Sequence, residues 1–211
     1  MSCRLIPARD HRVESIVVNS RFIASFAPAF SVETARAFIA QVKHEMPDAT
    51  HHVPAFIIGH GASIIEHCHD DGEPSGTAGR PVLAVLHGSG LGDVAVVVTR
   101  YFGGTKLGKG GLVRAYGDAV RAGLASLPVA EKIATQTVMV SLPYPWFEQV
   151  RRLADIHHGQ VLEEDFAGDV LLTLRFRQGD VTGFQLSLTE LTHGAIQGEV
   201  VATEPDTIFP V

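Results

Sequence analysis

The chain has 211 residues, of which 45% are hydrophobic and 19% charged, so its composition is that of a globular protein rather than a disordered one. No apolar run approaches the roughly 20 residues that a membrane-spanning helix needs. The first residues mix charges without an apolar stretch, so we expect no secretory signal peptide. The two cysteines, Cys3 and Cys68, belong to no C-x-x-C pair, so we expect no disulfide framework and a reducing, cytoplasmic environment.

The net charge of −6 is unevenly distributed along the chain. Residues 1–130 carry 12 Lys and Arg against 11 Asp and Glu, whereas residues 131–211 carry 5 against 12. The overall charge argues against a protein that binds polyanions over its whole surface. If RNA is a partner, the first part of the chain is the part expected to contact it.

The first elements are a hairpin and a helix. Two β-rich runs within residues 12–30 flank Asn19-Ser20, which we predict to be the turn of a hairpin. Ser31 stands where a helix N-cap belongs, and Pro47 ends the helix that follows. The inward positions of this helix, taken from the helical period, are Val32, Ala35, Ile39, Val42 and Met46.

The rest of the first half alternates apolar runs with glycine-rich loops. In chain order we predict strands at 51–60 and 62–67 turning at 59–61, a polar loop at 68–80, an apolar element at 80–88, a buried strand at 93–102 and a helix at 111–127. Pro81 favours a helix for the apolar element, although a strand is possible there. The inner stripe of the last helix is Leu112, Tyr116, Ala119, Val120, Gly123 and Leu127.

The second half predicts a ferredoxin-like order of elements. They are a strand at 134–142, a helix from Pro145 to Gly159 that includes Trp146 as a core or interface residue, strands at 160–166 and 170–176, a helix capped by Asp180, and a strand at 195–202. This βαββαβ order is the ferredoxin-like arrangement. We therefore predict an α+β protein with domains at 1–130 and 131–204, followed by a loose tail at 205–211.

A first polar, glycine-rich loop brings three carboxylates close together in the sequence. Its motif residues are Asp70, Asp71, Glu73, Ser75, Gly76, Thr77, Gly79 and Arg80. The glycines could direct several N–H groups at one anion. Asp70, Asp71 and Glu73 could hold Mg²⁺ or act as acid and base. The alternative is a structural loop whose carboxylates pair with nearby Arg and Lys.

A second glycine-rich loop, residues 99–111, leaves a buried strand and enters a helix, which is the setting of a phosphate-binding loop. Gly103 to Lys109 fits G-x-x-x-x-G-K, but Gly110 stands where a nucleotide-binding P-loop requires Ser or Thr. The missing hydroxyl argues against a P-loop NTPase.

General anion binding remains an expectation for this second loop. A helix N-terminus surrounded by basic side chains attracts phosphate, and Tyr101 with Phe102 adds aromatics that could stack on bases. The predicted anion- or RNA-binding residues are Arg100, Tyr101, Gly103, Gly104, Lys106, Gly108, Lys109, Gly110, Gly111 and Arg114. The alternative is a solvated loop whose basic residues pair with the three carboxylates.

Eleven histidines raise the question of a metal site. His51 and His52 point to opposite faces if they lie on a strand, whereas His67 and His69 share a face with Cys68 opposite. Since a zinc site needs convergent ligands, usually four, we predict no metal and no cofactor.

Two long segments, DDGEPSGTAGRPVL and VVVTRYFGGTKLGKGGLVRAYGDAV, closely resemble the signature of the YigZ/IMPACT family. The resemblance covers the first domain, and the second domain is similar to the small C-terminal domain of bacterial members. It implies a first domain folded like the second domain of ribosomal protein S5 and a second domain similar to a C-terminal domain of elongation factor G. Val53 stands where many members have a cysteine, so no thiol chemistry is expected there.

The resemblance also implies a function, because eukaryotic IMPACT regulates translation. Our leading hypothesis is a non-catalytic accessory protein of translation that binds RNA or the ribosome through the second glycine-rich loop. A second hypothesis is a Mg²⁺-dependent enzyme acting on a phosphorylated small molecule or nucleotide. A third is a protein–protein module with a translation-related partner.

Overall fold

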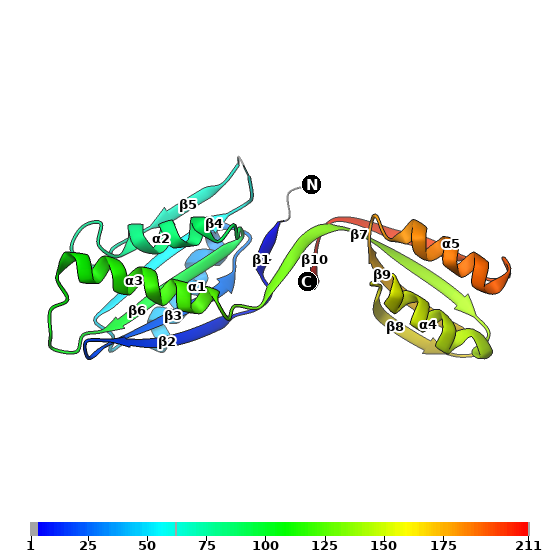
Figure 1. The fold of residues 1–211 in the computed structure, drawn as a ribbon, viewed down its shortest axis with the longest axis horizontal. Helices are drawn as coiled ribbons and strands as arrows, with labels where there is room; N and C mark the ends of the chain where they lie inside the picture. The colour runs from blue at the N-terminus through cyan, green and yellow to red at the C-terminus, as the bar shows by residue number, and fades with distance from the viewer. Residues whose placement is uncertain (1–3, 62, 211) are drawn as a thin grey trace. The chain divides into compact units, whose positions relative to one another are not determined.

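The computed structural model describes residues 4–61 and 63–210, so Cys3 and Ala62 lie outside the described residues. The chain divides into two compact units, one formed by the residues up to Glu131 together with Pro210 and the other by Lys132–Phe209 (Figure 1). This agrees with the predicted α+β protein of two domains. Among the described helices, none has the length and apolar character needed to cross a membrane.

The first unit is built on a five-stranded antiparallel sheet. Its elements are β1 (Leu5–Pro7), β2 (His11–Val17), β3 (Ser20–Pro28), α1 (Val32–Glu45), β4 (His51–Ile58), β5 (Ile65–Cys68), α2 (Gly79–Gly88), β6 (Val94–Tyr101) and α3 (Gly108–Leu124). The strands are ordered β2-β3-β6-β4-β5. The short β1 pairs instead with the first residues of β7 (Val129–Leu142).

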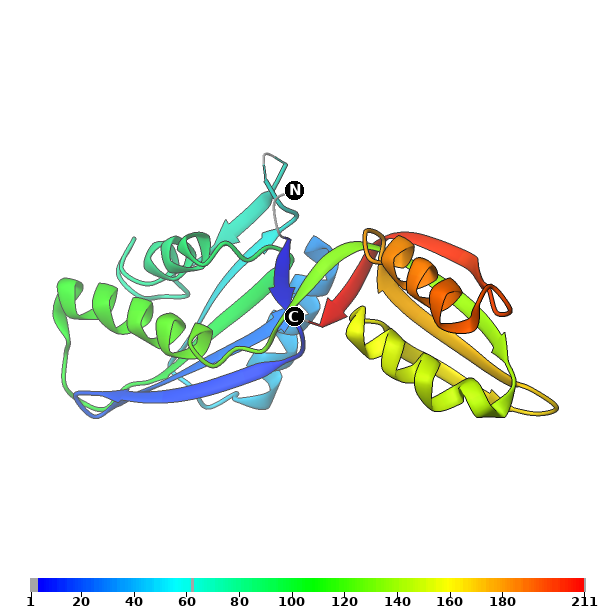
Figure 2. The same cartoon turned by 45° about the vertical axis from the view of Figure 1, so that its right-hand side comes forward.

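Helices cover both faces of this sheet, α1 on one and α2 with α3 on the other (Figures 1 and 2). Packing on both faces of the central strand β6 explains its composition. Val96 and Val98 pack with α2 and α3, whereas Ala95 and Val97 pack with α1. Because both faces are covered, β6 is apolar at every position from Val94 to Val98 instead of alternating. The strand ends at Tyr101, where the candidate site begins.

Local signals in the sequence place most boundaries correctly. Ser31 is the N-cap of α1 and forms a capping box with Thr34, with hydrogen bonds of 3.2 and 3.0 Å. The apolar element at 80–88 is the helix α2. The first hairpin turns at Val18 and Asn19, one residue earlier than predicted, because Val17 pairs with Ser20 and both turn residues have positive φ.

Helix α3 occupies Gly108–Leu124 rather than the predicted 111–127. Glycine has a low helix propensity, so the glycines at the start of α3 made its first turn resemble a loop in the sequence. The predicted inner stripe from Leu112 to Gly123 is buried as expected, and it holds the helix against the sheet.

The second unit has the predicted βαββαβ order. Its elements are β7, the short 3-10 helix η1 (Tyr144–Trp146), α4 (Phe147–Ile156), β8 (Gln160–Phe166), β9 (Val170–Arg177), α5 (Val181–Thr192) and β10 (Gly198–Pro210). The strands are ordered β10-β7-β9-β8. Trp146 packs at the edge of the core that α4 and α5 form with the sheet. Asp180 is the N-cap of α5, although its side chain makes no capping hydrogen bond.

The predicted loose tail at 205–211 is wrong for the described residues, because β10 continues to Pro210. This strand pairs with β7, and the hydroxyl groups of Thr135 and Thr207 lie 2.7 Å apart. Two prolines and the polar residues Asp206 and Thr207 concealed a strand that pairs with β7 and also buries Phe209.

Candidate functional site

The two glycine-rich loops are joined by one buried carboxylate, that of Glu73. Arg100, at the end of β6, donates from Nη1 to Glu73 Oε1 at 2.6 Å, and the hydroxyl of Tyr116 on α3 donates to the same oxygen at 2.8 Å. All three side chains are buried. The first loop, the central strand and α3 are therefore tied together by a single charged group.

The carboxylate of Asp70 occupies the N-terminus of α2. It accepts hydrogen bonds from the backbone N–H groups of Gly76, Ala78 and Gly79 at 2.8, 3.0 and 2.8 Å. Burial raises the pKa of Asp70, but these N–H groups outweigh it and hold the pKa below its ordinary value. The glycine-rich loop does gather N–H groups around an anion, and that anion is the protein's own side chain.

Asp71 is also committed to neighbours. Its Oδ1 lies 3.0 Å from Lys43 Nζ, and its Oδ2 accepts from the backbone N–H of His52 at 2.7 Å. Burial raises the pKa of Asp71, whereas these two donors lower it by more. The three carboxylates thus face three different partners, which favours the structural alternative for this loop. Within residues 4–61 and 63–210, no group of three His, Cys, Asp or Glu is arranged to hold a metal.

The remaining residues of the first loop serve its shape. Thr77 Oγ1 donates to the Pro74 carbonyl at 2.6 Å, and Gly76 has a φ of 74°, a conformation that favours glycine. Gly79 lies so close to His69 that an added Cβ would come within 2.9 Å of its backbone. Ser75 and Arg80 are exposed.

The predicted binding residues of the second loop fall into two groups, those held in contacts within the protein and those exposed to solvent. Arg100 is buried, so it is a structural residue rather than a surface contact. Tyr101 lies under the guanidinium of Arg21 and donates its hydroxyl to Asp48 at 3.0 Å. The exposed positions of the predicted set are Gly104, Lys106, Gly108, Lys109, Gly110 and Arg114, and Phe102 beside them is 44% exposed.

Glycines fix the path of this second loop. An added Cβ at Gly103 would lie 2.0 Å from the carbonyl oxygen of Asn19, so the loop rests directly on the β2–β3 turn. Gly104 and Gly108 have φ values of 86° and 69°. Gly111 packs against Leu107, with 3.0 Å from its Cβ position to the Leu107 Cβ.

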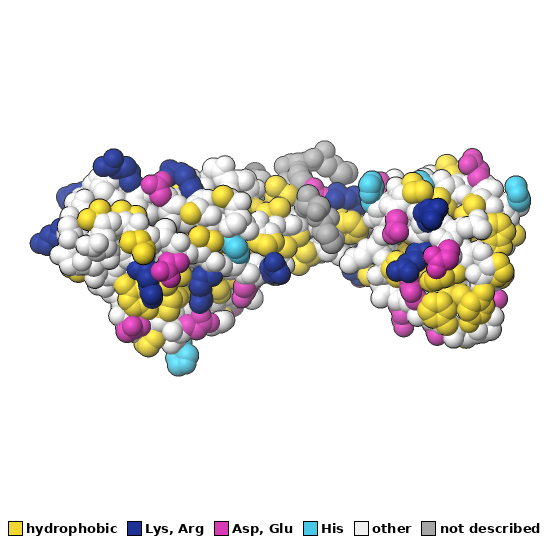
Figure 3. All heavy atoms as spheres, turned by 60° about the horizontal axis from the view of Figure 1, so that its bottom comes forward, with side chains coloured by type: hydrophobic (Ala, Val, Ile, Leu, Met, Phe, Trp, Pro, Cys, Tyr) yellow, Lys and Arg dark blue, Asp and Glu magenta, His cyan; other side chains and the backbone are white. Residues whose placement is uncertain are grey.

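The N-terminus of α3 is open, in contrast to that of α2. No side chain caps it, and its first turn contains no acidic residue. Lys106 and Lys109 flank it, and Arg114 follows one turn later, where its Nε donates to the Gly110 carbonyl at 3.3 Å. In Figure 3 Lys and Arg side chains gather at the left end of the first unit, where Figure 1 shows the start of α3.

Sequence reasoning missed Ser20 at this site and considered His51 only as a metal ligand. Ser20 Oγ accepts from Arg100 Nη2 at 3.3 Å and from the Gly103 N–H at 3.2 Å. His51 Nδ1 lies 2.7 Å from the Asp71 carbonyl. Ser20 is 80 residues from Arg100 in the chain, and no local pattern marks such a contact. Of the two histidines expected to share a strand face, His67 packs against Phe56 with 5.4 Å between the ring centroids. His69 lies beyond the end of β5, and its Nδ1 accepts from the Asp71 N–H.

Comparison with known proteins agrees with this two-part architecture. Residues 18–124 match the Impact N-terminal domain, and residues 140–195 match a domain of unknown function, DUF1949. The chain is 37% identical over 198 residues to the IMPACT family member YigZ of Escherichia coli, covering 93% of this chain and 97% of that one. It is 40% identical over 182 residues to an IMPACT family member of Thermus thermophilus, covering 86% and 98%.

A eukaryotic protein and a solved structure extend the comparison. The bovine Protein IMPACT is 30% identical over 107 residues, which cover 49% of this chain and 33% of that protein. A crystal structure described as that of a hypothetical protein is 36% identical, with a TM-score of 0.62 over 96% of this chain and 98% of that one.

Proposed function

Because the chain belongs to the IMPACT family, we propose that it is a non-catalytic accessory protein of translation that binds RNA, free or in the ribosome. The family resemblance supports the connection with translation, since the first unit is similar to the eukaryotic Protein IMPACT. The contact surface is formed by Phe102, Lys106, Lys109 and Arg114, and we call it the basic loop surface.

The open N-terminus of α3 carries this proposal. The N–H groups of an uncapped first turn and the helix dipole attract phosphate, and the neighbouring lysines add to this attraction. Phe102 offers an exposed ring on which a base can stack, and the Arg100 guanidinium lies 5.4 Å from the centre of that ring. The corresponding position of α2 is filled by Asp70, so the second loop is the better phosphate site.

The contacts of the three carboxylates, and the lowered pKa values of Asp70 and Asp71, support binding rather than catalysis. A general acid or base works best when its pKa lies near the working pH. The pKa values of Asp70 and Asp71 lie below the ordinary value, and Glu73 is held between Arg100 and Tyr116. These contacts favour the RNA-binding hypothesis over an enzyme that uses this loop.

The test is fluorescence anisotropy with labelled single-stranded RNA and with purified ribosomal subunits, over a range of salt concentrations. Phosphate contacts make affinity fall with salt, and each lost contact lowers the slope by about 1. The Lys106→Ala, Lys109→Ala double variant should therefore bind more weakly, with a slope smaller by about 2. A double variant with the same loss of charge, Arg9→Ala with Arg36→Ala, changes exposed residues outside the loop and should bind almost as wild type.

Two results would sink the proposal. One is the absence of saturable binding to either RNA or subunits at low salt. The other is an equal loss of affinity in the two double variants, which would reduce the interaction to net charge.

A further inference from the structure

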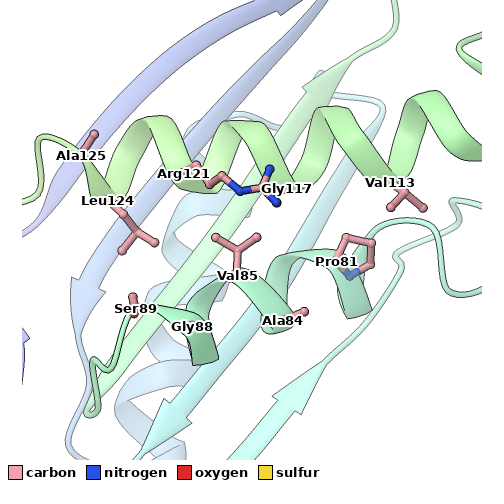
Figure 4. Close-up of a pocket in the computed structure, with 10 residues that line it drawn as sticks. All are labelled: Pro81, Ala84, Val85, Gly88, Ser89, Val113, Gly117, Arg121, Leu124 and Ala125. Carbon is pink, nitrogen blue, oxygen red and sulfur yellow. The ribbon is translucent and has the colours of Figure 1, made fainter.

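Helices α2 and α3 lie side by side and leave a groove of about 690 Å³ on the side away from the sheet (Figure 4). Its lining is mainly apolar and small. Ala84, Val85 and Gly88 contribute from α2, and Val113, Gly117 and Leu124 contribute from α3. Val113 is 41% exposed, so this lining includes apolar surface open to solvent.

The small residues leave room for another backbone. No atom lies within 4 Å of a Cβ placed at Gly88. The atom nearest to such a Cβ at Gly117 is Arg121 Nη1, 3.4 Å away, so a backbone can approach there once this flexible side chain turns aside. Helices pack with their axes 8–10 Å apart when small side chains lie between them. Since α2 has 10 residues and is therefore about 15 Å long, the groove accommodates roughly three turns of a helix.

The two helices are basic although the chain as a whole is acidic. They contain Arg80, Lys109, Arg114 and Arg121 against a single acid, Asp118. Of these cations, Arg121 lines the groove, and Figure 4 shows its side chain running along α3 and ending beside Gly117. Its ion pair with Asp118 is exposed, and pairs of this kind contribute little and exchange readily.

We propose that the groove between α2 and α3 binds an amphipathic helix of a partner protein, whose apolar face fills the groove and whose carboxylate pairs with Arg121. An apolar floor with a cation at its rim is complementary to an acidic amphipathic helix. RNA fits less well, because the lining contains no aromatic side chain for stacking and Arg121 is its single cation. This surface is separate from the basic loop surface and does not depend on RNA binding.

The probe is a pair of synthetic peptides, about three turns long and held helical by a side-chain bridge, with leucines on one face. One carries glutamates beside the leucines and the other carries lysines at the same positions. Titration of the full chain by amide NMR should show shifts concentrated in α2 and α3 with the acidic peptide only. Arg121→Glu should weaken this binding about tenfold, because it opposes like charges.

Matched variants separate the groove from other surfaces. Arg36→Glu makes the same change of charge on α1 and should leave the affinity unchanged. Ala84→Trp fills the groove from an exposed position, so it should block binding while the protein stays folded. The Lys106→Ala, Lys109→Ala variant should bind the peptide as wild type does, which distinguishes failure here from failure of the RNA proposal.

Several outcomes would overturn the inference. They are shifts absent from α2 and α3, equal affinity for the lysine peptide, and an RNA oligomer that competes with the acidic peptide at the same amides. If the chain self-associates and the same amide signals shift, the groove binds a second copy of the chain instead.

Discussion

Glu73 and Arg100 lie 27 residues apart in the sequence, and their side chains form a buried ion pair with 2.6 Å between Oε1 and Nη1. The pair ties the first glycine-rich loop to the central strand of the sheet. Arg100 also donates to Ser20, so the β2–β3 turn belongs to the same network. The surface loops are therefore positioned by charges in the interior of the first unit.

Breaking this pair should be costly. Arg100→Ala leaves the Glu73 carboxylate buried without its main partner, and such changes cost about 3–5 kcal/mol. Urea unfolding should show this loss, whereas Arg121→Ala, which breaks an exposed pair, should cost less than about 1 kcal/mol. Similar losses in the two variants would contradict the structural role of Glu73.

Tyr116 should resist ionisation while the protein is folded. Burial, followed by the hydrogen bond to the Glu73 carboxylate, raises the pKa of Tyr116 far above its ordinary value. The stability from this group is thus complete below the unfolded pKa of about 10 and is lost as pH rises further. Tyrosinate absorbance should show Tyr116 ionising only with unfolding. The step should vanish in Tyr116→Phe, and a normal titration of Tyr116 in the folded chain would refute the contact.

Asp70 and Asp71 should contribute to acid unfolding. Their folded pKa values are lowered, so their stabilisation is present above the unfolded pKa of about 3.9 and is lost as pH falls below it. Stability measured against pH should fall less steeply in this range for the Asp70→Asn, Asp71→Asn variant than for wild type. At neutral pH, Asp70→Ala should cost about 0.5–2 kcal/mol, as for other lost helix caps. If stability falls equally steeply with falling pH in the variant and in wild type, these hydrogen bonds do not persist in solution.

Replacing two glycines of the second loop by alanine should change the stability of the protein in opposite directions. At Gly103 a methyl group would meet the Asn19 carbonyl at 2.0 Å, so Gly103→Ala should destabilise the first unit by about 1–3 kcal/mol. At Gly110, within α3, nothing lies within 4 Å, so Gly110→Ala should stabilise by about 0.5–1 kcal/mol. Thermal unfolding of the two variants distinguishes these effects, and a shift of the same sign in both would disagree with the loop path described.

The sequence predicts elements well where the signal is local. The Ser31 cap, the apolar run of β6 and the βαββαβ order each depend on neighbours in the chain. The hairpin turn was misplaced by one residue because a valine with positive φ, Val18, is an unfavourable choice that no turn rule anticipates.

The candidate site was harder to predict because its contacts join distant residues. The sequence marks both glycine-rich loops and predicts, as one alternative, that their charges pair. It does not show that Glu73 forms its ion pair with Arg100, or that Arg100 is buried and so unavailable to a ligand. Ser20, which completes the network, carries no signal of its own.

The Asp70 cap has a consequence for how this loop could acquire a new property. Removing the carboxylate, for example by Asp70→Gly, would leave three N–H groups directed at the space of its two oxygens, which is how proteins build receptors for small anions. Formate or phosphate in solution could then replace the missing side chain and restore the lost stability. The loop is in this sense an anion receptor supplied with its ligand by the chain itself, and one substitution separates the occupied form from the vacant one.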